Sequence, residues 1–164
     1  MQYVPESLWV KGSASAPFTI TADTVKPGLL APASFTIGGV QYAVALFPDN
    51  VTYVLSPGAI SGISSRRARP GDTITIYGIG FGSVSPGIPP GQLASQLNAI
   101  AAPLVVRLGG TEATVSYKGL APNFVGLYQF KVVIPAIATG DTVPLTFSLG
   151  GVAGTQNLSI AVGN

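Results

Sequence analysis

The stretch Thr73–Tyr77 reads TITIY, in which polar and apolar side chains alternate. The same alternation recurs in Thr114–Tyr117, Leu127–Val132, Leu145–Leu149 and Leu158–Val162. Because successive side chains of an extended chain point to opposite faces, a period of two predicts strands with one buried face. Glycine or proline separates these segments at the intervals typical of a β-sandwich or barrel. The sequence therefore predicts an all-β protein.

Gly-Gly pairs at positions 38–39, 109–110 and 150–151 stand between strand-like runs. A two-residue hairpin turn of the primed type needs a positive φ at its centre, which glycine supplies without steric cost. We predict that each pair forms the tip of a β-hairpin.

Residues 82–103 show no sustained alternation and are expected to form a long irregular insert. Within it, residues 92–101 (QLASQLNAIA) fit either a short helical turn or an irregular loop. The prolines at 89, 90 and 103 keep a helix there short, since proline is tolerated at a helix start but not in its interior. The sequence leaves both alternatives open.

The chain of 164 residues is 47% hydrophobic and 9% charged, with a formal net charge of +2. Such a chain can bury enough apolar surface to fold, which excludes a disordered protein. It contains neither cysteine nor histidine, which excludes a disulfide scaffold, a thiolate metal site and the commonest catalytic base. The net charge is too small for the many phosphate contacts of nucleic-acid binding. We expect no nucleic-acid partner.

The longest apolar stretch, residues 97–106, is interrupted by Asn98 and Pro103. It is far shorter than the roughly 20 residues that a spanning helix needs, so we expect no membrane span. The first ten residues, MQYVPESLWV, lack the basic head and apolar run of a signal peptide. An export signal is therefore expected upstream of this sequence.

The start of the chain resembles its end. Residues 10–21 follow the order strand, small-residue turn, strand, which is also the order at 149–161. We therefore interpret residues 1–22 as the terminal hairpin of a preceding unit and residues 23–164 as the main domain. Asp23–Gly28 (DTVKPG) is the predicted linker between them.

The six carboxylates of the chain show no paired arrangement of the kind that glycoside hydrolysis needs. All but Asp23 have turn-forming neighbours, where acidic side chains commonly accept hydrogen bonds from their own backbone. Asp49-Asn50 alone supplies too few oxygen ligands for calcium. We therefore expect turn capping, no metal, no cofactor and no enzymatic activity. The residues concerned are Glu6, Asp23, Asp49, Asp72, Glu112 and Asp141.

The arginines Arg66, Arg67 and Arg69 form the densest run of charge in the sequence, within Ser64–Arg69. Guanidinium groups suit planar anions, so the run could grip an acidic polysaccharide or the carboxylates of a protein partner. The alternative is a solvated linker ahead of the strand at Thr73. Both interpretations stay open at this point.

Two motifs carry a resemblance to known families. Residues 69–82 (RPGDTITIYGIGFG) resemble the opening of IPT/TIG-type immunoglobulin-like domains. Residues 117–135 (YKGLAPNFVGLYQFKVVIP) resemble the Y-x-G-L-A-P-x-F-V-G-L-Y-Q-x-N-V-x-V-P signature of a C-terminal domain in secreted proteins of Solibacter-type acidobacteria. Lys131 stands where that signature has Asn, and residues 29–56 are only loosely similar. Further marks of the family are found at 15–19, 69–72, 86–92, 139–141 and 150–152.

The resemblance implies an antiparallel immunoglobulin-like (IPT/TIG-like) β-sandwich of about seven to nine strands. The N-terminal extra hairpin, residues 1–22, would then belong to a preceding immunoglobulin-like unit. The resemblance also implies that the domain is appended to a larger extracellular or cell-surface bacterial protein. No catalytic residue carries over from the family.

The aromatic side chains are expected to lie in the core or on a sheet face. In immunoglobulin-like folds a tyrosine hydroxyl often caps a corner, and we predict this role for Tyr128 or Tyr117. Phe124 and Tyr128 are expected on one face of the same strand. Trp9 is a candidate contact with a partner or a neighbouring domain. The residues expected in the core or on a sheet face are Tyr77, Tyr117, Phe124, Tyr128, Phe130 and Phe147.

We therefore expect a non-catalytic structural, adhesion or interaction module. Its partners would be neighbouring domains of the same polypeptide, a polysaccharide or another surface protein, and exposed edge strands would offer a contact surface. The alternative is a carbohydrate-binding module that uses exposed aromatic rings, among them Trp9.

Overall fold

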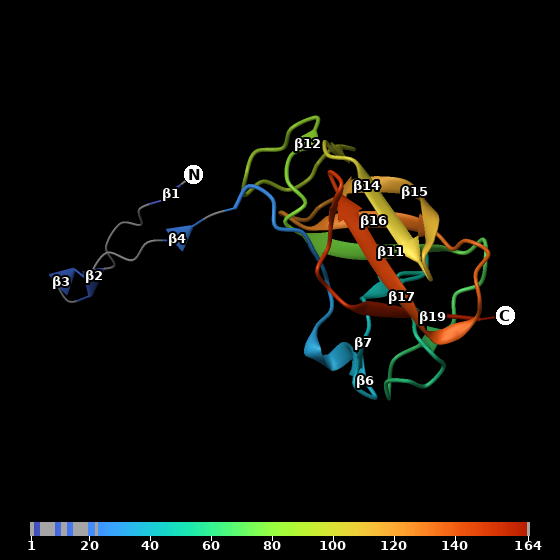
Figure 1. Cartoon of the computed structure of the whole chain (residues 1–164). Coiled ribbons are helices and arrows are strands. Elements are labelled where there is room, and N and C mark those ends of the chain that lie inside the picture. Colours follow the sequence, from blue (N-terminus) through green and yellow to red (C-terminus); the bar gives the residue numbers. More distant parts are fainter. Residues whose placement is uncertain (1, 4–8, 11–12, 15–19, 22, 164) are drawn as a thin grey trace.

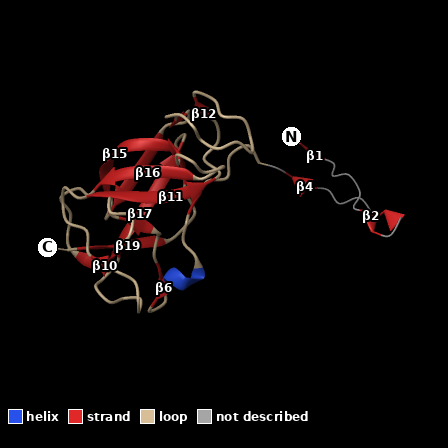
Figure 2. Cartoon of the chain, turned by 180° about the vertical axis from the view of Figure 1, so that it is seen from behind, coloured by secondary structure: helices blue, strands red, loops and turns tan. Residues whose placement is uncertain are grey.

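The computed structural model describes residues 2–3, 9–10, 13–14, 20–21 and 23–163, with the side chains described from Asp23 onward. These residues form strands and one short 3-10 turn, so the all-β prediction is confirmed (Figures 1 and 2). In chain order the elements are β1 (Gln2–Tyr3), β2 (Trp9–Val10), β3 (Ser13–Ala14), β4 (Ile20–Thr21), β5 (Gly28–Leu29), η1 (Ala33–Phe35), β6 (Thr36–Ile37), β7 (Val40–Gln41), β8 (Ala45–Leu46), β9 (Tyr53–Val54), β10 (Ser65–Arg66), β11 (Thr73–Ile79), β12 (Val84–Ser85), β13 (Ala99–Ile100), β14 (Leu104–Leu108), β15 (Thr111–Leu120), β16 (Tyr128–Val133), β17 (Gly140–Leu149), β18 (Val152–Ala153) and β19 (Leu158–Val162).

One large sheet holds most of these strands. Its eleven strands follow the order β10-β9-β8-β11-β16-β15-β14-β17-β18, with β5 beside β11 and β19 beside β17. The pairs are antiparallel except β9–β10, which is parallel. The five alternating segments lie in β11, β15, β16, β17 and β19. The expectation of seven to nine strands is too low, because residues 28–66 add two-residue strands that carry no alternation of their own.

Strand β15 belongs to both halves of this sheet. Its first residues pair with β14, whereas its later residues, from Thr114 to Leu120, pair with β16. The register shifts between Val115 and Tyr117, and such a bulge bends a strand and increases its twist. The two halves therefore face each other. A single buried cluster fills the space between them and takes side chains from both halves, including Ile74, Phe130, Val106 and Leu145.

The edge at β19 is covered by two segments from the first half of the chain. Tyr42 and Ala68 form parallel bridges with Ser159 and Val162 of β19. The amide of Ala68 also donates to the carbonyl of Ala161 at 2.9 Å. These contacts satisfy backbone groups that an open edge strand would expose to other chains.

All three Gly-Gly pairs form hairpin tips, as predicted. They connect β6 to β7, β14 to β15 and β17 to β18, and the residues next to each pair face one another across the hairpin. The first glycine of each pair has φ of 56–58° and the second 81–84°. These are the positive values that a type I′ turn requires at both positions.

The insert at 82–103 is irregular except for the short antiparallel pair β12–β13. The helical alternative for residues 92–101 is wrong, since these residues form loop and the strand β13. Asn98 explains part of this outcome. Its side chain is buried, and its Oδ1 accepts a hydrogen bond from the amide of Leu120 at 2.7 Å. The insert is thereby fixed to the end of β15.

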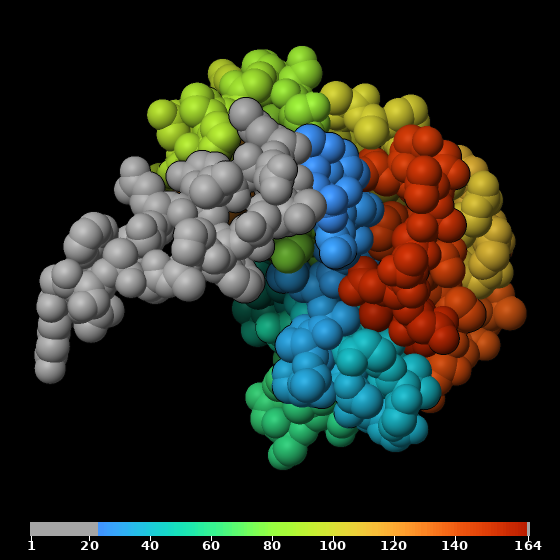
Figure 3. Space-filling model, turned by 60° about the vertical axis from the view of Figure 1, so that its left-hand side comes forward, coloured from blue at the N-terminus to red at the C-terminus, as the bar shows by residue number. Residues whose placement is uncertain are grey.

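Gln156 joins β5 to the connection between β18 and β19. Its Nε2 donates to the carbonyl of Leu29 at 2.9 Å, and its Oε1 accepts from the amide of Leu29 at 2.7 Å. The side-chain amide of Gln156 thus makes the two hydrogen bonds with Leu29 that a neighbouring strand would otherwise make. Figure 3 shows the blue start of the described chain beside the red C-terminal part.

Replacing Gln156 by leucine is expected to lower the free energy of unfolding by about 1–3 kcal/mol, because the partly buried amide and carbonyl of Leu29 lose their partners. The measurement is the midpoint of urea denaturation. Gln92→Leu, on an exposed part of the insert, is the matched control. Equal midpoints for the two variants would contradict this role of Gln156.

The strands of the N-terminal region pair among themselves. β1 pairs with β4 and β2 with β3, and none of the described pairings joins them to the large sheet. The linker predicted at Asp23–Gly28 overlaps the body, because Gly28 already belongs to β5. The assignment of residues 1–22 to a preceding unit stays a prediction.

Candidate functional site

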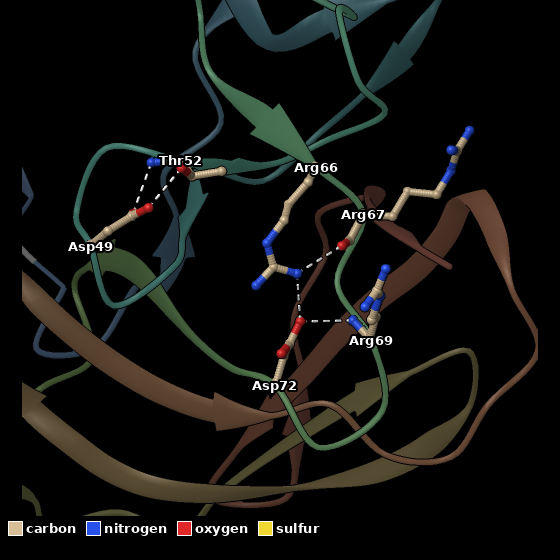
Figure 4. Close-up of polar contacts among 6 residues, drawn as sticks. All are labelled: Asp49, Thr52, Arg66, Arg67, Arg69 and Asp72. Atoms are coloured by element: carbon tan, nitrogen blue, oxygen red, sulfur yellow. Dashed lines mark hydrogen bonds and ion pairs between the residues drawn. The ribbon is translucent and has the colours of Figure 1, made fainter. Parts of the chain in front are cut away.

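The predicted arginine run lies where β10 leads toward β11. Arg66 turns toward Asp72, and its Nη1 donates to the carboxylate at 2.8 Å and to the carbonyl of Arg67 at 3.2 Å (Figure 4). The guanidinium also stacks on the ring of Phe47, with 3.5 Å between Cζ and the ring centroid. Arg66 is therefore held by an ion pair and a cation–π contact at the same time.

Arg67 and Arg69 do not converge with Arg66. Arg67 makes a two-pronged ion pair with Asp141 at the start of β17, through Nε and Nη2. Arg69 contributes its backbone amide to Asp72 at 2.9 Å. Its side chain is exposed and has no ion pair or hydrogen bond within residues 23–163. Two of the three arginines thus bind carboxylates of their own chain, and both interpretations of the arginine run stay predictions.

Turn capping by carboxylates is confirmed at two positions. Asp49 Oδ1 accepts hydrogen bonds from the amides of Val51 and Thr52 at 3.0 and 2.9 Å, and Asp72 accepts from the amide of Arg69. The prediction is wrong for Asp141 and Glu112, because both lie in strands and pair with arginines. The remaining acidic residue with a turn-forming neighbour, Glu6, lies outside the described residues.

These contacts change the acidity of the carboxylates. Burial raises the pKa of Asp72. The hydrogen bonds from Arg66 and from the Arg69 amide, together with the positive charges of Arg66 and Arg69, lower the pKa by more than burial raises it, so the net shift is downward. The hydrogen bond from Arg67 is the main reason that the pKa of Asp141 is also lowered. Both carboxylates therefore bind a proton less readily in the folded chain than in the unfolded one.

The lowered pKa of Asp72 predicts loss of stability in acid. The unfolded chain binds more protons, so the stabilisation is fully present above the unfolded pKa of about 3.9 and disappears as the pH falls through the lower folded value. We expect Asp72→Asn to flatten the decline of the urea midpoint between about pH 5 and pH 2. Asp23→Asn, at an exposed carboxylate 3.9 Å from Lys26, is the control. An unchanged acid profile in Asp72→Asn would refute the assignment.

Two of the tyrosines have the predicted structural role. The hydroxyl of Tyr128 donates to the carbonyl of Gly82, and that of Tyr117 donates to the carbonyl of Leu120 at 2.7 Å. Phe130 and Phe147 are buried, as expected. Phe124 contradicts the prediction, because it lies in the loop before β16 and is exposed, so that it does not share a strand with Tyr128. The side chain of Trp9 lies outside the described residues.

Sequence reasoning missed an apolar surface at the other end of the molecule. It consists of Leu93, Leu97, Phe124 and Val125, which are 57%, 75%, 54% and 51% exposed, and we call it the loop face. Two hydrogen bonds fix its two loops together, from the amide of Ala94 to the carbonyl of Phe124 and from the amide of Asn123 to the carbonyl of Ala94. A signal was present in the sequence, since residues 73–106 and 119–130 contain no charged residue.

A groove of about 460 Å³ borders the loop face. It lies between the insert and the loop before β16, and Val125 belongs to both surfaces. Its lining is mostly apolar and includes Ile88, Pro89, Pro90 and Tyr128. Exposed apolar surfaces of this size are typical of contacts with other macromolecules.

Within the part of the chain that the structure describes, no three acidic residues lie close enough together to hold a metal ion. The same part contains no helix with the length and apolarity to cross a membrane.

Comparison with known proteins does not assign this chain to a family. No model of a protein family, no curated protein and no solved structure matches this chain. The resemblance to the acidobacterial C-terminal domain stays a prediction.

Proposed function

We propose that residues 23–164 form a non-catalytic structural or adhesion module of a larger extracellular bacterial protein, with an immunoglobulin-like (IPT/TIG-like) sandwich. The loop face is the observation that carries this proposal. Four large apolar side chains stand in solvent on loops that are fixed by backbone hydrogen bonds. A monomeric soluble domain gains nothing from exposing them, whereas a contact surface does.

The charged residues support the same proposal. Asp49 and Asp72 accept backbone amides, and Asp141 and Glu112 pair with arginines on neighbouring segments. These four carboxylates therefore make hydrogen bonds and ion pairs within the protein's own chain. We place the contact surface on the loop face and not on the edge of β19, because Tyr42 and Ala68 already cover that edge.

Carbohydrate binding is the second candidate function, and Phe124 is the observation that favours it. A sugar-binding platform stacks several rings against its ligand, and the exposed ring among residues 23–163 is that of Phe124. The apolar surroundings of this ring, with Leu93, Leu97 and Val125, suit a protein surface better than a hydroxyl-rich polysaccharide.

Affinity electrophoresis distinguishes the two candidates. The whole chain is run through native gels that contain soluble polysaccharides, neutral in one series and acidic in another. We expect the mobility to equal that in a gel without polysaccharide. Retardation that Phe124→Ala abolishes would replace the proposed function by carbohydrate binding through the loop face. Retardation that Arg69→Ala abolishes would assign an acidic polysaccharide to the arginine run.

A further inference from the structure

The loop face lies at the end of the sheet where the chain enters the body. Gly78 of β11 and Leu120 of β15 both face Tyr128, the first residue of β16. The end of β11, the end of β15 and the start of β16 are therefore neighbours. The insert that follows β11 and the loop between β15 and β16 carry the loop face at this end (Figure 1).

The chain that leads into β5 runs along the same end. The amide of Lys26 donates to the carbonyl of Gly80 at 3.0 Å. Val25 Cγ2 lies 3.0 Å from the position that a Cβ on Gly82 would occupy, and Gly82 lines the groove beside the loop face. The chain at Val25–Lys26 thus enters the body next to the groove that borders the loop face.

The preceding segment has a composition that suits this surface. Residues 1–22 contain one acidic and one basic residue, Glu6 and Lys11. Their large apolar side chains are those of Met1, Tyr3, Val4, Leu8, Trp9, Val10, Phe18 and Ile20. Burial of such side chains against an uncharged apolar surface is favourable and needs no charge partner. The short tether makes the contact intramolecular, which raises the effective concentration of the segment at the surface.

We propose that the loop face is the docking surface for the aromatic-rich segment 1–22 of the same chain. The inference rests on the proposed function and deepens it, because it names the partner of the contact surface. The hydrogen bond from Lys26 to Gly80 fixes the start of the body beside this surface, so the segment is joined to it by a short stretch of chain. Trp9 carries the largest apolar side chain of the segment and is its expected anchor.

The chain contains a single tryptophan, Trp9, so its fluorescence reports on the docked state directly. The experiment measures the emission maximum and the acrylamide quenching of the full chain. In the native chain we expect blue-shifted emission and weak quenching, both independent of protein concentration. In the double variant Leu97→Ser/Phe124→Ser we expect both to move to the values of N-acetyltryptophanamide. The far-ultraviolet circular dichroism of that variant should equal that of the native chain, because neither side chain belongs to the buried core of the body.

Val51→Ser is the matched control. Val51 is 65% exposed and follows β8, which runs away from Gly80 toward the start of β11. Solvent-like emission in the native chain, or an unchanged emission in the double variant, would overturn the inference. A blue shift that disappears on dilution would overturn it in favour of a contact between two copies. Each of these results leaves the electrophoresis outcome untouched, so failure of the inference is distinguishable from failure of the proposed function.

Discussion

Replacing Gly80 by alanine is expected to destabilise the protein by about 3 kcal/mol or more, through two effects that add. Gly80 has φ of +75°, where an L-residue costs roughly 1–2 kcal/mol. In addition, a Cβ at this position would lie 2.1 Å from the carbonyl oxygen of Lys26 and 2.8 Å from its carbon. These are backbone atoms, so the collision can be relieved only if the entering chain moves away from β11.

Gly58→Ala separates the two effects. Gly58 has nearly the same φ, +72°, but no atom lies within 4 Å of its Cβ position. This control should cost only the backbone strain, about 1–2 kcal/mol. The measurement is the free energy of unfolding from urea denaturation for the two variants and the native chain. If both variants lose the same amount, the close approach of Lys26 to Gly80 contributes nothing and the prediction fails.

The regular part of the fold could be predicted because its signal is local. Alternation in Thr73–Tyr77 and Leu158–Val162 reflects a face that every residue of the strand helps to bury. The Gly-Gly turns are local as well, since the φ values depend on the pair itself. The strands β8, β9 and β10 were not predictable in this way, because each has only two residues, too few to show an alternation. β8 depends on pairing with Thr75 and Ile76 of β11, and β9 and β10 on pairing with their neighbours.

The contacts of the candidate site also depend on residues that are distant in the sequence. The arginine run was visible, yet the partner of Arg67 is Asp141, which is 74 positions away in the sequence. A charge pattern cannot show such a pairing. The prediction for Phe124 was wrong for a different reason. An aromatic residue beside a predicted strand is usually buried, so it was expected in the core or on a sheet face. The absence of charge over 73–106 and 119–130 was the available indication that an apolar surface could form there.

The residue at the centre of the aromatic core, Phe81, lies in the turn at 78–82. Phe81 follows β11 within a glycine-rich turn, so no alternation points to its burial, yet it is one of the least exposed large side chains. Its ring lies 4.6 Å from that of Phe130, 5.4 Å from that of Phe147 and 5.6 Å from that of Tyr128, measured between centroids. All three pairs are tilted, which is a favourable arrangement for aromatic rings.

Replacing Phe81 by alanine is therefore expected to lower the free energy of unfolding by about 3–5 kcal/mol, through lost burial and the cavity that remains. A further effect is specific to this position. Phe81 fixes the start of the insert to the core, next to the carbonyl of Gly82 that accepts the Tyr128 hydroxyl. We expect the near-ultraviolet circular dichroism of the tyrosines to weaken even in the variant molecules that stay folded.

Phe124→Ala is the control for the size and chemistry of the substitution. It removes the same ring from the loop face, outside the buried core, and its expected effect is limited to the docking contact, about 1 kcal/mol. Phe81→Leu keeps much of the buried volume and should fall between the two, because a branched aliphatic side chain fills part of the space but loses the contacts between rings. A loss in Phe81→Ala no larger than that in Phe124→Ala would mean that the contacts of Phe81 with Phe130, Phe147 and Tyr128 do not hold the two halves of the sheet together.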